Sequence, residues 1–180
     1  MDAKIKDLIK KLNSCPTGKD SWSEFENVCT DVLKYVFVPP LSIPKIQPRT
    51  YSEIDRRDAV FPNRNFQNTC IWGQLFNELK ARMILVEFKN YNKTEVGKDE
   101  VNQTRNYLTE PMGKLAIMVC SKIPNKAAHI KRNSIFSAEG KIILFITKKE
   151  LEEMIYIKER GEDPADLIMD LIECFYLQHE

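Results

Sequence analysis

The sequence has no long apolar run, no surplus of charge of one sign and no paired cysteine motif. Because about 18 consecutive apolar residues occur nowhere, no transmembrane helix and no membrane partner is expected. The 27 Lys and Arg residues are balanced by 26 Asp and Glu residues, which excludes a global field that would attract nucleic acid or an anionic membrane. Any polyanionic partner must therefore be bound by a local basic patch.

The five cysteines stand singly, without a C-x-x-C pair or metal-ligand spacing, which argues against a disulfide framework and a zinc site. The N-terminal stretch MDAKIKDLIKKLNSC is charged throughout and lacks the apolar core of a signal peptide. We therefore expect an intracellular, cytoplasmic protein with free, mostly buried thiols. No G-x-x-x-x-G-K segment occurs, so no ATP-driven motor is expected in this chain.

The chain has 180 residues, 43% of them hydrophobic and 29% charged, which is enough for one globular domain over 1–180. Apolar spacing predicts helices at about 2–12, 21–37, 72–79, 97–109, 125–138, 147–160 and 164–178, and strands at 58–61, 83–90, 115–120 and 142–146. Strand–helix–strand spacing between 83 and 146 indicates parallel crossovers. The predicted fold class is α/β, with a central mixed β-sheet flanked by helices on both faces.

Local signals fix several element ends. Ser21 with Glu24 and Thr147 with Glu150 have the spacing of capping boxes, so a helix is expected to begin after each. The prolines between residues 41 and 56 exclude a central strand there and leave room only for an edge strand.

The strand at 83–90 carries an acid and a base where a buried sheet would have apolar residues. Alternation puts Glu87 and Lys89 on one face, and an unpaired buried charge is costly. Asp58 lies on another predicted strand, so two carboxylates could converge on a hard divalent cation. The alternatives are a partly exposed Glu87–Lys89 ion pair and an ion pair of Asp58 with Arg56 or Arg57.

Two helices add polar side chains. Glu26 lies on the apolar face of the second predicted helix, whereas Glu24 lies on its polar face; a carboxylate at the border of the apolar stripe is the alternative for Glu26. Gln103 and Tyr107 are one helical turn apart on the polar helix and can hydrogen-bond together toward one site. Without that site, the pair would be a solvated helix face.

Taken together, these residues resemble the PD-(D/E)xK restriction-endonuclease-like nucleases, particularly the branch of Mrr-type restriction endonucleases and archaeal junction resolvases. The resemblance covers about residues 21–146, with two C-terminal helices at 147–178 beyond it. It is carried by F-E at Phe25-Glu26, R-R-D-A-V-F with Asp58, V-E-F-K-N with Glu87 and Lys89, and Q-x-x-x-Y at Gln103–Tyr107. The chain departs from the pattern in having Arg57 where proline is common before the aspartate, and a longer insertion at 62–82.

The resemblance implies a restriction-endonuclease-like core and a Mg²⁺-dependent endodeoxyribonuclease, with Mn²⁺ as a substitute metal. It implies that Asp58, Glu87 and the carbonyl of Phe88 hold the metal, with Glu26 completing the metal shell directly or through water. It also implies catalytic roles for Lys89 on the attacking water or developing charge, and for Gln103 and Tyr107 in orienting Lys89 or the phosphate. Restriction, repair and defence against foreign elements are roles left open.

Nucleic-acid contacts are expected from basic side chains near predicted strand ends and on the helix after residue 125. They are Arg56, Arg57, Arg64, Lys122, Lys126, Lys131 and Arg132, with a solvated charged face as the alternative. No separate recognition motif is found, so sequence specificity is expected from substrate shape, a partner protein or dimerisation.

The last predicted helix is apolar around much of its circumference, which indicates either burial in the monomer or a homodimer contact. Two rival interpretations of the whole chain are a nuclease fold that only binds nucleic acid and a structural subunit of a larger complex.

Overall fold

The computed structural model describes residues 2–51 and 56–179. Its helices are α1 (Ala3–Ser14), α2 (Trp22–Phe37), α3 (Ile71–Leu79), α4 (Lys98–Tyr107), α5 (Lys126–Glu139), α6 (Lys148–Glu159) and α7 (Ala165–Leu177), with a 3-10 turn, η1 (Lys19–Ser21), before α2. The strands are β1 (Lys45–Ile46), β2 (Ala59–Pro62), β3 (Met83–Lys89), β4 (Leu115–Cys120) and β5 (Ile142–Ile146).

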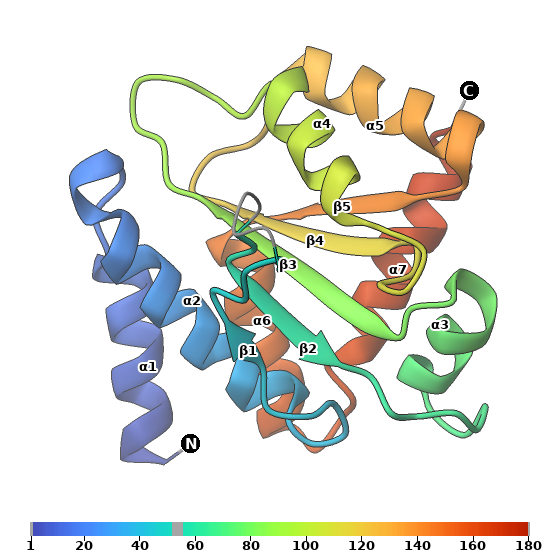
Figure 1. Cartoon of the computed structure of the whole chain (residues 1–180). Coiled ribbons are helices and arrows are strands. Elements are labelled where there is room, and N and C mark those ends of the chain that lie inside the picture. Colours follow the sequence, from blue (N-terminus) through green and yellow to red (C-terminus); the bar gives the residue numbers. More distant parts are fainter. Residues whose placement is uncertain (1, 52–55, 180) are drawn as a thin grey trace.

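The strands form one mixed sheet in the order β1-β2-β3-β4-β5 (Figure 1). The β1–β2 and β2–β3 pairs are antiparallel, whereas β3–β4 and β4–β5 are parallel and are connected through α4 and α5. The predicted α/β class with a mixed sheet between helical layers is therefore confirmed. Both β4 and most of β5 are buried, as expected for central parallel strands with apolar side chains on both faces.

Alternation along β3 directs its side chains into two different layers. Val86 and Phe88 pack in the larger core cluster with residues of α1, α2, α3, α6 and α7. Leu85 packs in the second cluster with residues of α4 and α5, so Glu87, two residues later, faces the same side. Figure 1 shows α4 and α5 on one side of the sheet and α6 and α7 on the other.

One of the two predicted capping boxes is wrong. The Thr147 Oγ1 and the Glu150 carboxylate are within hydrogen-bonding distance of each other at the start of α6, and Glu150 also accepts from the Thr147 amide, as expected. Ser21 makes no side-chain cap for α2, because it ends the η1 turn with φ −108° and ψ 19° instead of the extended backbone that a cap requires. The helix nevertheless begins at the next residue, as predicted.

The insertion at 62–82 holds α3 against the end of the sheet. The buried Asn63 amide donates to the carbonyls of Trp72 (2.8 Å) and Ala81 (3.0 Å), which ties both ends of the insertion together. Gly73 lies so close to Gln67 that an added Cβ would be 1.9 Å from its carbonyl oxygen. The insertion is therefore a packed element with a fixed shape.

The last helix is buried within this chain. Ile168, Ile172 and Phe175 of α7 belong to the larger core cluster and are at most 2% exposed. Of its remaining apolar side chains, Tyr176 and Leu177 are exposed, at 41% and 87%. Burial in the monomer thus accounts for most of the apolar circumference of α7. Among the residues that the structure describes, no helix is long and apolar enough to cross a membrane.

Candidate active site

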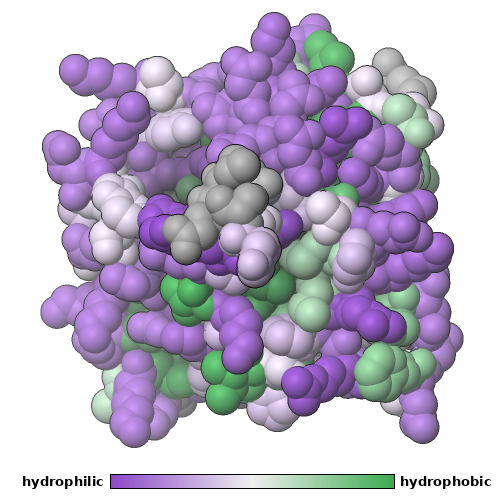
Figure 2. Space-filling model, in the orientation of Figure 1, coloured by the Kyte–Doolittle hydropathy of each residue, from purple (hydrophilic) through white to green (hydrophobic). Residues whose placement is uncertain are grey.

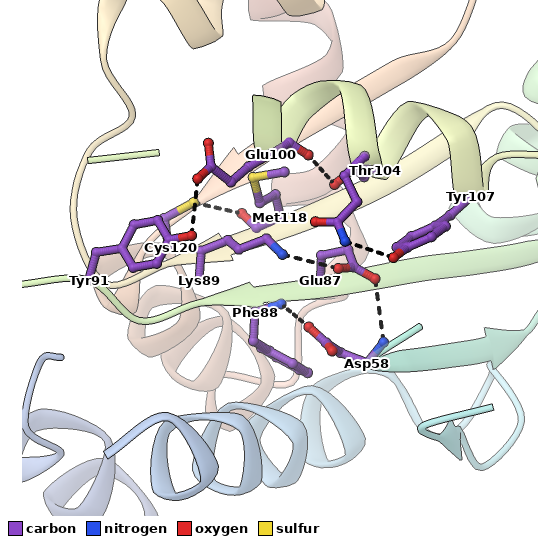
Figure 3. Close-up of polar contacts among 11 residues, drawn as sticks. Asp58, Glu87, Phe88, Lys89, Tyr91, Glu100, Thr104, Tyr107, Met118 and Cys120 are labelled. Carbon is purple, nitrogen blue, oxygen red and sulfur yellow. Dashed lines mark hydrogen bonds and ion pairs between the residues drawn. The ribbon is translucent and has the colours of Figure 1, made fainter. Parts of the chain in front are cut away.

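Strand pairing places the two strand carboxylates next to each other. The β2–β3 register pairs Ala59 with Val86, so Asp58 and Glu87 follow as neighbours at the end of the ladder. The Asp58 amide donates to Oε1 of Glu87 (3.4 Å), and the Phe88 amide donates to Oδ2 of Asp58 (2.8 Å) (Figure 3). These bonds hold both carboxylates next to β3 at the end of its pairing with β2.

Lys89 completes the strand motif. Its Nζ lies 3.3 Å from Oε2 of Glu87, and the two side chains are 13% and 2% exposed. Burial lowers the pKa of Lys89, but the carboxylates of Glu87 and Asp58 outweigh it, so the net pKa is raised. Lys89 therefore stays an ammonium ion at neutral pH and can act as a fixed positive charge.

The surroundings of Glu87 disfavour the charged form of its side chain. Burial raises its pKa, the Asp58 carboxylate adds to the rise, and Lys89 only partly opposes it, so its pKa reaches about 7. Lys89 therefore offsets only part of the cost of burying the charged Glu87 carboxylate beside Asp58. A divalent cation at this point would supply further positive charge.

Glu26 reaches the site from the opposite helical layer. It is 5% exposed on α2. Burial raises its pKa, the Gln47 amide opposes the rise, and the nearby Asp58 carboxylate adds to it. Gln47 links the two acids, because its side chain donates to Oε1 of Glu26 (3.1 Å) and its backbone amide donates to the Asp58 carbonyl (2.8 Å).

Gln103 and Tyr107 come from α4 above the strand motif. The Gln103 Nε2 donates to the Tyr107 hydroxyl at 2.8 Å, which confirms that the two side chains interact. In Figure 3 this hydroxyl points toward the Glu87 carboxylate. Arg57 lies with its guanidinium 5.8 Å from the centre of the Tyr107 ring and donates to the Tyr107 carbonyl (3.5 Å).

The donor set agrees with a hard cation. Within residues 2–51 and 56–179, no three His, Cys, Asp or Glu side chains cluster as a metal-holding group. Asp58 and Glu87 do lie together, however, and Mg²⁺ commonly takes one or two carboxylates and keeps several waters. These two acids, with the backbone carbonyl of Phe88, the residue after Glu87 on β3, have the oxygen donors that fit Mg²⁺ or Mn²⁺ and do not suit a thiolate-bound metal.

The expected nucleic-acid residues come from several separate elements. Arg57 lies beside Tyr107, and Arg56 influences the Glu26 carboxyl, so both are near the candidate site. Lys122 donates to the carbonyl of Asn92, just after β3, whereas Arg64 lies in the insertion. Lys126, Lys131 and Arg132 are in the α5 helix.

Arg132 is half-buried against two aromatic rings. Its guanidinium lies between the rings of Phe145 and Phe175, at 4.9 and 5.0 Å, and burial lowers its pKa. Its position on α5 turns the guanidinium toward β5 and α7.

Three residues near the site were missed by the sequence interpretation. Gln47 adopts a left-handed backbone (φ 49°), unusual for a residue other than glycine. Asn90, directly after the V-E-F-K motif, accepts from the Gly18 amide and donates to the carbonyls of Pro16 and Ser21, so it fixes the segment that leads into α2. Glu100 accepts from the Tyr91 hydroxyl (3.1 Å) near Lys89. The asparagine after the motif was the one usable signal.

Comparison with known protein families finds no match, and no solved structure matches the chain. Among curated proteins, the putative transposon gamma-delta 80.3 kDa protein of Escherichia coli (strain K12) is 30% identical over 115 residues. The aligned region covers 64% of this chain and 16% of that protein, so the chain spans a small part of the relative's length.

Proposed function

We propose that the protein is a Mg²⁺-dependent nuclease of the PD-(D/E)xK type that hydrolyses phosphodiester bonds in DNA, and that its sheet and helices are a restriction-endonuclease-like core. The observation that carries the proposal is the convergence of Asp58, directly before β2, with Glu87 and Lys89 of the paired strand β3, through the Asp58–Glu87, Phe88–Asp58 and Lys89–Glu87 contacts. Along the chain, α2 is followed by the antiparallel strands β1, β2 and β3, then by α4 and by β4, which is parallel to β3. This order agrees with the helix and strand order of that core.

The metal would be held by Asp58, Glu87 and the Phe88 carbonyl, with Glu26 reaching it directly or through water. When bound, Mg²⁺ supplies neutralisation of the phosphate and a lowered pKa of a coordinated water. The raised pKa of Glu87, caused mainly by burial and further by the Asp58 carboxylate, supports this assignment, because a bound cation would stabilise the charged form of Glu87.

The remaining side chains position the reactants. The Lys89 ammonium donates to the attacking water or to the phosphate oxygen on which negative charge develops. The hydrogen-bonded Gln103–Tyr107 pair orients Lys89 or the phosphate from the α4 side. Expected products carry a 5′-phosphate and a 3′-hydroxyl, by resemblance to the family.

A titration of purified protein with Mg²⁺, against plasmid, linear, branched and single-stranded DNA and RNA, tests the proposal. We expect DNA cleavage that depends on Mg²⁺ or Mn²⁺ and stops in EDTA, because the ligands are oxygen atoms. Asp58→Asn, prepared in parallel, controls for contaminating nucleases. Cleavage that continues in EDTA, or a wild type that cuts none of the substrates at any metal concentration, would contradict it and favour a binding or structural role.

A further inference from the structure

A groove of about 480 Å³ runs along the sheet beside the candidate active site. Its floor includes Val60 of β2, Met83 of β3 and Met112. Val60 lies on β2, two residues after Asp58 and thus roughly 7 Å along the chain, and packs in the same cluster as Leu85 and Tyr107. Figure 2 shows apolar atoms over β2 and β3, below and to the right of the centre, bordered by hydrophilic side chains.

The walls of the groove are positively charged. Lys45, Arg57, Arg64 and Arg82 line it, and no Asp or Glu does. In the part of the chain that the structure describes, none of these four forms a salt bridge, and the buried Nε of Arg57 has no hydrogen-bond partner. Four cations that form no salt bridge with any described residue favour a polyanion as the occupant.

The groove also offers aromatic and apolar surface. Phe66, in the insertion, is 62% exposed and is held edge-on against Phe76, with ring centres 5.1 Å apart. Arg82 lies over the other ring of this pair, 5.9 Å from the Phe76 centre. An exposed ring that its neighbours hold in place is a surface on which a planar base can stack.

We propose that this groove holds a single-stranded segment of the substrate, with phosphates on its basic walls and at least one unstacked base against Phe66. The proposal rests on the proposed nuclease function. A duplex presents phosphates but keeps its bases stacked inside, so it would use the cations and leave Phe66 and the apolar floor exposed. The combination of both surfaces therefore selects a strand with accessible bases, such as a single strand, a flap or a branch.

Binding measured in EDTA, where no cleavage is expected, separates the two kinds of contact. We use fluorescein-labelled oligothymidylate, an abasic strand of equal length and a duplex. The double variant Arg64→Ala/Arg82→Ala should bind oligothymidylate more weakly and should lower the slope of log K against log[salt] by about 1.4, at about 0.7 per phosphate contact. Lys10→Ala, an exposed lysine on α1, is the charge control and should change neither quantity.

Phe66→Ala should weaken oligothymidylate binding by about 5-fold or more without changing the salt slope. It should leave abasic-strand binding unchanged, because that strand offers no base. Phe66 is exposed, so the variant should fold, and its melting temperature checks this.

The outcomes distinguish this proposal from the nuclease function. If the expected binding pattern is found in a protein that never cleaves, the proposed role of the groove is supported and the proposed nuclease function is contradicted. If the protein cleaves DNA but the wild type binds duplex and oligothymidylate equally tightly, the nuclease function is supported and the single-strand role of the groove is contradicted. A Phe66→Ala variant that weakens abasic-strand binding as much as oligothymidylate binding would contradict that role as well. Binding of polyglutamate as tightly as oligothymidylate would also overturn it, in favour of an acidic protein partner.

Discussion

Glu26 tests the site at the scale of one residue. The side chain is buried on α2, and Gln47 donates to its Oε1, an acceptor that glutamine would also provide. We expect Glu26→Gln to keep this hydrogen bond but to lose the negative charge, and to reduce cleavage by ~10–100-fold, as for a group that supports a metal shell.

The matched control is Glu24→Gln, an exposed acid two residues earlier on the same helix. Its cleavage rate should equal that of wild type. Steady-state cleavage rates of the two variants, with melting curves to check folding, provide the measurement. Equal activity losses in two equally folded variants would show that Glu26 has no special role.

The raised pKa of Glu87 predicts how stability depends on pH in the metal-free protein. Its pKa is about 7 in the folded chain, mainly because of burial, against 4.5 as the ordinary value. Between these two values the folded chain keeps a proton that the unfolded chain releases, so the contribution of Glu87 is full below about pH 4.5 and is lost as pH rises through about 7.

Urea unfolding in EDTA at several pH values measures this contribution. The free energy of unfolding should fall by at most about 3 kcal/mol from this group between about pH 5 and pH 8. In Glu87→Gln that part of the fall should be absent. An identical pH dependence in both proteins would contradict the assignment.

At this scale the sequence predicted the Glu87–Lys89 and Gln103–Tyr107 pairs, because strand alternation and helical spacing are local rules. It offered the convergence of Asp58 with Glu87 only as a possibility, since that depends on which strands pair. Gln47 could not be predicted in the same way. Its role depends on a left-handed backbone in a proline-rich loop and on contacts with a helix and a strand far away in the chain.

At the scale of elements, the burial of α7 predicts that the protein needs this helix to fold. Ile168, Ile172 and Phe175 are almost completely buried, and each such side chain contributes ~1.5–3 kcal/mol. Deletion after Asp163 should therefore remove an amount comparable to the whole stability of a domain, ~5–15 kcal/mol, and yield insoluble protein.

A milder pair of variants keeps this prediction testable. Ile172→Ala should cost ~2–5 kcal/mol, whereas Leu177→Ala, at an 87% exposed position, should cost little. Chemical unfolding at two protein concentrations measures both. A soluble, fully active truncation, or a concentration-dependent loss confined to Leu177→Ala, would contradict burial of α7 in the monomer and indicate a dimer contact instead.

The helices could be predicted from their hydrophobic period or their capping and breaking residues, β3 from its alternation, and β4 and β5 from their short continuous apolar runs. The strand β1 could not, since it is two residues long and lies between Pro44 and Pro48. It pairs only with β2 at the edge of the sheet, as the prolines required. The Ser21 cap was misjudged because the motif does not reveal the 3-10 turn that precedes it.

At the scale of the molecule, the two faces of the mixed sheet have different roles. One face packs against α1, α2, α6 and α7, and the other carries Glu87 and Lys89 toward α4. Sequence patterns predicted this layering, but the groove beside Asp58 arises only when the insertion at 62–82 folds back on the sheet. Long-range packing of this kind has no local signature.

The most direct measurement compares Lys89→Ala with Asp58→Asn, following Mg²⁺ binding by calorimetry and DNA cleavage on the same folded samples. If Lys89 acts on the reacting groups, Lys89→Ala should keep or raise Mg²⁺ affinity while cleavage falls by ~10²–10⁴, and Asp58→Asn should lose both. If the Glu87–Lys89 pair is only structural, Lys89→Ala should lose ~3–5 kcal/mol of stability. The account is contradicted if the wild type has no nuclease activity and the Lys89→Ala variant melts far below it.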